Sequence, residues 1–520
     1  MKESLRQSMA SLHTWTGLLL GWLLFMMFVS GTAAYFQEEI TQWMQPEAAG
    51  QASPEQATQA AVAWLEKEAP DASTWFITPP GKRSATTQVF WVPAERKPGM
   101  RRGDTSAVLD SSGKLTDIRD TRGGFFLYRL HFDLHYLPVI WARYLVGVAA
   151  MFMLIAILSG IITHKKIFID FFLLRFGKGQ RSWLDSHNVS AVLALPFHLM
   201  ITYTGLVTLA TLYMPFGIAA NYANPDKFFE AVFPDREAME RSGQPAPLAS
   251  IDPMMRAASA DWGGKAVGFI RIVNPGDRNA SVTLTRAPSE AIGSRGETLA
   301  FDGATGKRLG ASSPKGGATA TESVMIGLHS GRFANMALRW LYFLSGLFGT
   351  AMVGTGLILW TAKRRQRLPD PARPYLGFRI VERLNIAVIS GFPAGIASYF
   401  LANRLLPLTM ASRAEWEVHT LFLTWGAVLL WAVLRPARRG WVEGLAIAAL
   451  MYAAVPVVNA ATTARGLIPS IARGDWLFIT FDLTMLVLAA LFAFAALRVL
   501  RHVPKAAGSR RASGSAAVMA

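Results

Sequence analysis

The sequence contains no cysteine and comparatively few charged residues, and each shortage restricts what the protein can be. Without thiolates the chain cannot form disulfides, ligate an iron–sulfur cluster through Cys, attach haem through a C-x-x-C-H motif or use a thiol nucleophile. Charged residues make up 17% of the 520 residues, whereas average soluble domains contain about 25%. Because 52% of the residues are hydrophobic, the composition predicts a membrane protein. Any redox chemistry must use a cofactor that is bound non-covalently.

Eight stretches reach or approach the length of about 20 apolar residues that a membrane-spanning helix needs. They cover residues 12–36, 139–163, 188–213, 337–360, 384–401, 417–434, 442–461 and 476–499. The fifth stretch is the shortest and contains Pro393. An even number of spans places both ends of the chain on the same side of the membrane.

The loops between these stretches differ in charge, and this difference predicts the orientation. Lys and Arg are concentrated near Met1 and after the second, fourth, sixth and eighth stretches, all on one side. Under the positive-inside rule this side is the cytoplasm. We therefore expect a multi-pass protein of the bacterial inner membrane with both termini cytoplasmic, whose net charge of +17 needs no nucleic acid as a partner. A cleaved signal peptide is the alternative for the first stretch, but that stretch is long, contains Trp and precedes no clear cleavage site.

Two long polar inserts lie on the opposite, periplasmic side. Each begins with a helix-like segment that has a Ser at the N-cap and a nearby Pro, Ser53-Pro54 in the first and Ser250 with Pro253 in the second. Each continues with short strand-like runs and ends in a hairpin, turning at residues 110–113 and 302–306. The predicted fold class is an α-helical membrane protein with about eight transmembrane helices and two small periplasmic α+β inserts.

The predicted boundaries follow from these stretches and inserts. The first span covers residues 1–36, the first insert 37–138, the second span 139–163, the third span 188–213, the second insert 214–336, the fourth span 337–360, a C-terminal region of four membrane helices 384–499, and a basic cytoplasmic tail 500–520.

The first 365 residues contain an internal duplication. Two His–Gly pairs have the same spacing of 18 residues, and four Ser/Thr–Gly pairs lie near the ends of the first four spans. The former are His13 with Gly31 and His187 with Gly205; the latter are Ser30-Gly31, Ser159-Gly160, Thr204-Gly205 and Thr355-Gly356. Leu134-His135 before the second span also resembles Leu328-His329 before the fourth. The pattern predicts a helix–insert–helix unit repeated twice, with His at matching positions.

Histidine is the candidate ligand type. Eight of the nine His residues lie in or beside the first four or the sixth span. On one continuous helix, His187 and His198 would face within about 20° of each other, about 16 Å apart. A single His at a helix end is commonly solvated or part of a cap, but the repetition and the membrane depth of His198 favour ligands. The candidates are His13, His135, His164, His187, His198 and His329; no catalytic residue is assigned.

Haem b fits this pattern better than zinc. Zinc in a membrane bundle usually recruits Asp, Glu or Cys beside His, and the first four spans contain almost no acidic residues. Haem b needs axial imidazoles and an apolar, tightly packed bundle. We expect at least two haems b in a ladder across the membrane, with the axial pairings left open. The levels of His187 and His135 should be about 40 Å apart, with His198 as the only mid-depth candidate.

Other side chains have two explanations each. Gly17 and Gly21 share a helix face with His13, which fits haem contact and helix packing equally well. Four arginines near the outer histidines could pair with haem propionates or snorkel to the interface: Arg129, Arg143, Arg332 and Arg339. Trp75, Trp91 and Trp262 could line a binding surface, although scattered Trp residues more often belong to a core. His419 could be a further ligand or a quinone partner, but packing against a neighbouring helix is favoured.

Several segments resemble a known family. They are residues 12–18 (LHTWTGL), 187–189 (HNV) and 341–347 (LYFLSGL) with the following Trp360 and Lys363-Arg364, together with the hairpins of the two inserts. They resemble the PepSY-associated transmembrane proteins, also called iron-regulated membrane proteins. Within these, the sequence is most similar to inner-membrane ferric-siderophore reductases of the ferrioxamine reductase type. The resemblance covers residues 1–365 and is much weaker over the last four spans.

The resemblance implies haem-bearing helices around periplasmic PepSY units and an oxidoreductase that reduces Fe(III)-siderophore in the periplasm, releasing Fe(II). It maps the family's histidines onto the six candidates above. Some relatives carry a flavodoxin-reductase domain, whereas this sequence contains no dinucleotide-binding motif in a suitable context. We therefore expect an external electron donor, either a quinol or a cytoplasmic reductase. The alternatives are a haem-free PepSY binding or regulatory protein and a siderophore permease.

Overall fold

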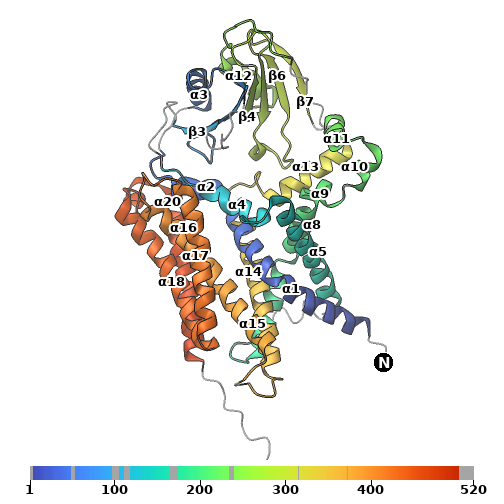
Figure 1. Ribbon diagram of the computed structural model, residues 1–520, viewed down its shortest axis with the longest axis vertical. Coiled ribbons are helices and arrows are strands. Elements are labelled where there is room, and N and C mark those ends of the chain that lie inside the picture. The colour runs from blue at the N-terminus through green and yellow to red at the C-terminus, as the bar shows by residue number, and fades with distance from the viewer. Residues whose placement is uncertain are drawn as a thin grey trace, which may run out of the picture.

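A computed structural model describes residues 4–48, 53–95, 105–110, 118–163, 174–232, 239–313, 316–371 and 373–502. Long helices make up one end of the molecule and a β-sheet lies at the other, as Figure 1 shows. Helix α1 begins at the end away from the sheet. We call the two ends of the helical bundle the sheet side and the far side.

Seven helical segments in the described ranges are long and apolar enough to cross a membrane. They are α1 (Leu5–Ala34), α5 (Val139–Thr163), α14 (Met336–Arg365), the joined segment Leu376–Leu405, α17 (Arg413–Leu434), α18 (Ala437–Thr462) and α20 (Trp476–Arg501). A bent pair of helices, α7 (Gln180–Leu193) and α8 (Leu195–Thr208), brings the number to eight if it counts as one span. By helix length and hydropathy, the chain is therefore a multi-pass membrane protein.

The third predicted span is bent rather than continuous. Helices α7 and α8 meet at Ala194 with an angle of 68° between them. Pro196 occupies the first turn of α8, where its ring blocks a straight continuation of α7 and it has no N–H to donate. The expectation of one helix over residues 188–213 is wrong. His187 and His198 lie on different helices and do not share a face.

The fifth span is longer than the sequence predicts. It runs from α15 (Leu376–Ile386) through a π-helical turn, η3 (Ala387–Gly391), into α16 (Phe392–Leu405). Pro393 lies in the first turn of α16, directly after the π-helical turn, where a missing N–H is tolerated. This segment is the most buried of the spans. It forms the centre of the C-terminal region.

The two polar inserts form one sheet rather than two separate units. Seven antiparallel strands are ordered β3-β2-β1-β4-β5-β6-β7. The strands are β1 (Ala72–Thr78), β2 (Thr87–Pro93), β3 (Ser106–Leu109), β4 (Val267–Val273), β5 (Ser281–Arg286), β6 (Thr298–Asp302) and β7 (Arg308–Ser312). Strand β1 of the first insert pairs with β4 of the second, with Trp75 opposite Ile272. This pairing removes one edge strand from each insert. The predicted strand at residues 114–118 lies largely outside the described residues.

One face of the sheet packs against α3 (Pro54–Glu68) and α12 (Ile251–Asp261). Ser53 caps α3 by accepting a hydrogen bond from the backbone N–H of Gln56, as the sequence predicts. Trp75 and Trp262 are buried in this core and Trp91 packs against it, so the three Trp residues are structural.

Further helices connect the sheet to the spans. They are α2 (Gln37–Met44), α4 (Gly123–Asp133), α9 (Ala210–Tyr213), α10 (Phe216–Asn221), α11 (Pro225–Val232), α13 (Gly317–Ser330) and α19 (Leu467–Arg473), with a 3-10 turn, η2 (Pro288–Glu290), in the second insert. Helix α4 packs against α1, and α13 packs against α8. These two helices therefore carry side chains into the sheet-side end of the bundle.

Candidate functional site

Two histidines face each other toward the far side of the bundle. The ring centroids of His13 in α1 and His187 in α7 are 6.1 Å apart, with ring planes at 74°. The Nδ1–H of His13 donates to the backbone carbonyl of Ala156 at 2.8 Å, and that of His187 donates to Met352 at 2.8 Å. Because a carbonyl can only accept, Nδ1 carries the proton and Nε2 carries the lone pair that can bind a metal. We call His13 and His187 the inner pair.

A second pair lies on the sheet side. The ring centroids of His131 in α4 and His329 in α13 are 6.2 Å apart, with ring planes at 36°. Their Nδ1–H groups donate to the carbonyls of Met27 at 2.7 Å and Ile201 at 3.0 Å. Burial lowers the pKa of both rings, and the repulsion that would arise if both rings were protonated further lowers the pKa of His329, to about 4. Both imidazoles of this outer pair are therefore neutral at pH 7 and suited to bind a metal.

Each of the four rings lies against a glycine of a neighbouring helix. A Cβ atom placed on the glycine would come close to the ring Cε1 in every case: 3.3 Å for Gly160 and His13, 3.1 Å for Gly356 and His187, 2.7 Å for Gly31 and His131, and 2.8 Å for Gly205 and His329. A side chain at any of these positions would push against the ring. The glycines thus allow a close approach of the imidazole to the helix backbone.

The four contacts have the same construction, and we call each one a His cradle. The carbonyl that accepts the Nδ1–H belongs to the residue four positions before the glycine, and a Ser or Thr directly precedes the glycine. That hydroxyl bonds back to its own helix, as Ser30 does to Met26 at 2.6 Å. The cradles are formed by residues 27–31 of α1, 156–160 of α5, 201–205 of α8 and 352–356 of α14. One histidine ring therefore packs against each Ser/Thr–Gly pair of the duplication.

A cavity of about 740 Å³ lies at the inner pair. Its lining is mainly apolar and includes His13, His187, His198, Gly17, Gly160 and Gly356. A Cβ on Gly17 would meet no atom of the described residues within 4 Å, whereas a Cβ on Gly21 would lie 2.7 Å from Leu357 of α14. Gly17 therefore faces open space and Gly21 serves helix packing, so the two glycines differ in role.

The two pairs are closer in depth than the sequence predicts. His131 bonds to the carbonyl of Met27, which follows His13 on the same helix. The intervening residues of α1 span about 21 Å at 1.5 Å per residue. The expected 40 Å concerned His187 and His135; the two pairs lie closer than that because α4 packs along α1 and brings His131, rather than His135, to the outer pair.

His198 lies on α8 and lines the same cavity as the inner pair. Its side chain is fully buried, and its ring lies 5.9 Å from Phe28 and 6.0 Å from Phe197 between centroids. The backbone of Ser345 and of Ala191 comes near the ring. Neither ring nitrogen reaches hydrogen-bond geometry with any described residue. No second histidine among those residues faces it.

His135 lies apart from both pairs. It follows the end of α4 with a left-handed φ of 50° and stacks on Phe422 of α17 at 5.6 Å. Partial burial, together with the charge of Arg122, lowers its pKa. The structure brings His131 rather than His135 to His329. His131 and His329 each lie in the last turn of their helix, α4 and α13. This shared position is the signal that selects His131.

Two other histidines are also away from the pairs. His164 lies outside the described residues. The Nδ1 of His419 bonds to the hydroxyl of Tyr136 at 2.5 Å, on the sheet side of α17. His419 therefore has a partner within the protein.

The arginines near the outer pair already have partners within the chain. Arg129 and Arg143 both pair with Asp133, and Arg339 pairs with Glu39. Arg332 lies over the ring of Tyr128, 5.9 Å from its centroid. Three of the four arginines thus form ion pairs with two carboxylates, Asp133 and Glu39, which neither sequence-based explanation included.

Each histidine pair supplies two ligands and no third. Among the described residues, no group of three or more His, Cys, Asp or Glu side chains is placed to hold a metal ion. Two imidazoles bound through Nε2 to opposite sides of one metal have centroids about 6 Å apart, because each metal–nitrogen bond is about 2.0 Å. The observed 6.1 and 6.2 Å agree with that spacing. Each pair can therefore hold a metal that brings its remaining ligands with it.

The comparison with known families covers the part of the chain that holds the cradles. Residues 10–363 match the family model described as the PepSY-associated TM region. The match includes all four cradles and both inserts, and it ends near the end of α14. No curated protein matches the chain.

Proposed function

Because the chain belongs to the PepSY-associated TM region family, we propose that it is a membrane oxidoreductase that holds two haems b and passes electrons across the bilayer to a ferric siderophore. The observation that carries this proposal is the presence of two facing histidine pairs at two depths of one bundle. The ferric-siderophore substrate comes from the resemblance of the sequence to ferrioxamine-type reductases.

The residues of the two pairs fit haem b. The spacing of the rings suits two imidazole ligands to one metal, and haem b would bring the remaining ligands that the described residues do not supply. The cavity at the inner pair, of about 740 Å³, is mainly apolar and falls within the usual range of about 300–1,000 Å³ for cofactor sites. Gly17 leaves one wall of this cavity open for a flat ligand. His13 with His187 would hold one haem, and His131 with His329 would hold the other.

Haem b would supply a one-electron iron couple at each pair. The protein's own groups hold the ligands in place and adjust their strength. Each Nδ1–H bond to a backbone carbonyl fixes the ring orientation and raises the basicity of Nε2. The surrounding apolar side chains exclude water, which favours the less charged oxidation state.

The orientation follows from the basic loops. Lys363, Arg364 and Arg365 end α14 on the far side, and the positive-inside rule makes that side cytoplasmic. The inner pair then lies near the cytoplasm, and the outer pair lies below a periplasmic sheet. His198 lines the cavity at the inner pair and contacts Phe28 of α1, which directly follows the carbonyl partner of His131. We propose that these two rings shorten the path of the electron, and that His198 itself does not hold a haem.

The chemistry at the substrate is a one-electron reduction. Oxygen-donor siderophores bind Fe(II) far less well than Fe(III), so one electron added to the bound Fe(III) releases Fe(II) and leaves the siderophore intact. A quinol gives two electrons and two protons, and therefore serves two Fe(III) ions. A cytoplasmic reductase is the other class of donor that the proposal allows.

The test is a visible spectrum of the purified protein. We expect a Soret band, an α band after dithionite reduction, and two haems per chain by pyridine haemochrome analysis. The reduced protein should be re-oxidised without oxygen by ferric hydroxamate or catecholate siderophores. A folded but colourless preparation from haem-replete cells would overturn the haem assignment. A haem protein that no ferric siderophore re-oxidises would overturn the reductase assignment.

The alternative functions have no observation of their own. A permease needs charged groups that can change partners in mid-span, whereas the buried Glu417 is held by Arg413 and Asn403. A haem-free regulatory protein would not require four cradles that present imidazoles in facing pairs. The electron conduit therefore remains the function that the geometry supports best.

A further inference from the structure

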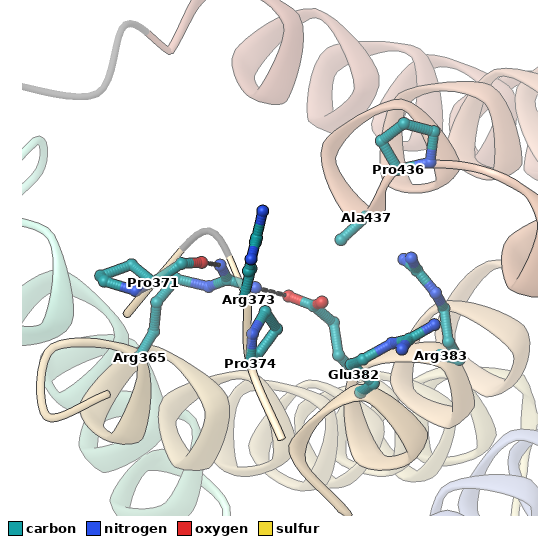
Figure 2. Close-up of a pocket in the computed structure, with 9 residues that line it drawn as sticks. Arg365, Pro371, Arg373, Pro374, Glu382, Arg383, Pro436 and Ala437 are labelled. Carbon is teal, nitrogen blue, oxygen red and sulfur yellow. Dashed lines mark hydrogen bonds and ion pairs between the residues drawn. The ribbon is translucent and has the colours of Figure 1, made fainter. Parts of the chain in front are cut away.

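A basic pocket lies on the far side of the bundle, separate from the histidine pairs. It has a volume of about 380 Å³ and forms where α14 ends and α15 and α18 begin. Four arginines and one carboxylate line it: Arg365, Arg373, Arg379, Arg383 and Glu382. Figure 2 shows Arg373 and Arg383 extending toward the same open space, with Pro436 and Ala437 across from them.

The positive charge in this pocket exceeds the negative charge that the described residues place there. Arg365 bonds to Glu382 and to the carbonyl of Pro371. The side chains of Arg373, Arg379 and Arg383 make no ion pair or hydrogen bond with any described residue, and Nη1 of Arg383 is buried without a partner. Three neighbouring guanidinium groups repel one another until an anion joins them. The pocket is therefore built to receive negative charge.

Phosphate is the anion that suits this arrangement. The planar guanidinium group binds two phosphate oxygens at once. Basic pockets between membrane helices on the cytoplasmic side are typical sites for anionic lipid headgroups. Three exposed aliphatic residues lie within two positions of a lining residue in the sequence: Leu376 is 69% exposed, Ile380 49% and Leu434 69%. These side chains can contact acyl chains, whereas a soluble phosphate compound would gain nothing from them.

We propose that this pocket binds the phosphate headgroup of an anionic phospholipid from the far-side leaflet. The loop between α14 and α15 separates the pocket from the cavity at the inner pair. Arg367 and Tyr375 of this loop line the cavity, and Pro371 and Arg373 line the pocket. A lipid held here fixes one wall of the inner cavity. The site itself does not depend on the proposed electron transfer.

The test is lipid binding to the delipidated full-length protein, followed by native mass spectrometry. Tetraoleoyl cardiolipin is the probe, and dioleoyl phosphatidylcholine is the zwitterionic comparison. The variant is Arg373→Gln/Arg379→Gln/Arg383→Gln, which spares the Arg365–Glu382 ion pair. The control is Arg439→Gln/Arg498→Gln/Arg501→Gln, which removes three exposed charges from the same side of the membrane.

We expect the pocket variant to bind cardiolipin at least about tenfold more weakly than the wild type, and the control to bind within about twofold. If the triple variant does not fold, Arg379→Gln alone and the salt dependence of wild-type binding test the same site. Equal cardiolipin binding by the wild type and the pocket variant would overturn the proposal. Calorimetry with glycerol 3-phosphate forms the second arm, and binding as tight as that of cardiolipin would overturn the lipid assignment in favour of a soluble phosphate.

Discussion

The two halves of the bundle bury polar side chains in opposite ways. In the half that matches the family, four histidines donate Nδ1–H to backbone carbonyls and turn toward each other in pairs. In the C-terminal half, buried Arg, Asn, Asp and Glu side chains bond to one another. In the first arrangement Nδ1 carries the proton, so Nε2 is the ring nitrogen that can bind a metal. The second arrangement uses its polar groups to bond to one another. The difference separates a binding region from a scaffold.

The C-terminal network lies at the sheet side of the bundle and reaches α2. Arg413 and Glu417 pair at 2.5 Å with both side chains almost fully buried, and the Nδ2–H of Asn403 donates to Glu417 at 2.7 Å. The indole N–H of Trp43 in α2 donates to Asp482 of α20 at 3.0 Å. Because α2 follows α1 and leads to the sheet, this network holds the sheet in position over the spans.

The strongest test of the difference between the two halves of the bundle is the removal of one histidine from a pair. We expect His131→Ala to lose the outer haem and to retain about one of two haems per chain, because His329 would be left without its partner. His135→Ala, four residues away, should keep both, since His135 stacks on Phe422 outside the pair. Pyridine haemochrome analysis of the two variants measures the difference. Loss of haem in His135→Ala with full content in His131→Ala would reverse the assignment.

Removal of a charge from the network should instead change stability and leave haem content unaltered. Arg413→Ala leaves Glu417 as an uncompensated buried charge and removes the donor to the carbonyl of Asp120. Breaking a buried pair in this way costs about 3–5 kcal/mol. Thermal unfolding in detergent, followed by tryptophan fluorescence, measures the loss. The exposed Arg498→Ala serves as the control and should stay within about 0.5 kcal/mol. Haem loss from folded Arg413→Ala would contradict the role of this half as a scaffold.

The cradles themselves can be compared with one another. Gly31→Ala places a methyl group 2.7 Å from Cε1 of His131, whereas Gly160→Ala places one 3.3 Å from His13. Overpacking of the first kind costs about 1–3 kcal/mol and should displace the His131 ring, which lowers outer haem content. The second variant should retain both haems. Spectra of the two proteins at equal protein concentration provide the measurement, and equal haem content would show that the cradle is more tolerant than the contact distance implies.

The sequence predicts the helical spans well because they depend on local hydropathy. Seven of the eight predicted spans correspond to single helical segments, and the second has the same bounds, Val139–Thr163. The bend at Ala194 was missed because hydropathy continues through it, although Pro196 marks it. The joined sheet was missed because pairing of β1 with β4 brings together residues nearly two hundred positions apart. No local pattern specifies such a contact.

The sequence predicts the part of the candidate site that depends on local repeats, and it does not predict the part that depends on contacts between distant segments. The repeat shows the Ser/Thr–Gly pairs and three of the cradle histidines, His13, His187 and His329. The membrane depth of His198, which lines the cavity, selects it separately. The sequence repeat selects His135 rather than His131, because spacing alone does not show where α4 ends. The network around Arg413 was not anticipated, since its members come from loops and helices that are distant in sequence.

The contact between the two halves provides the smallest test. The indole N–H of Trp22 in α1 donates to Oδ1 of Asn385 at 2.9 Å, and Nδ2 of Asn385 donates to the carbonyl of Leu357 at 3.0 Å. Trp22→Phe keeps most of the packing but leaves the fully buried Asn385 oxygen without a donor, which costs about 1–2 kcal/mol. We expect a slightly lower unfolding temperature and unchanged haem spectra, measured on one preparation. A shifted spectrum of the inner haem would mean that the C-terminal half also adjusts the histidine pairs, and the division between binding region and scaffold would no longer hold.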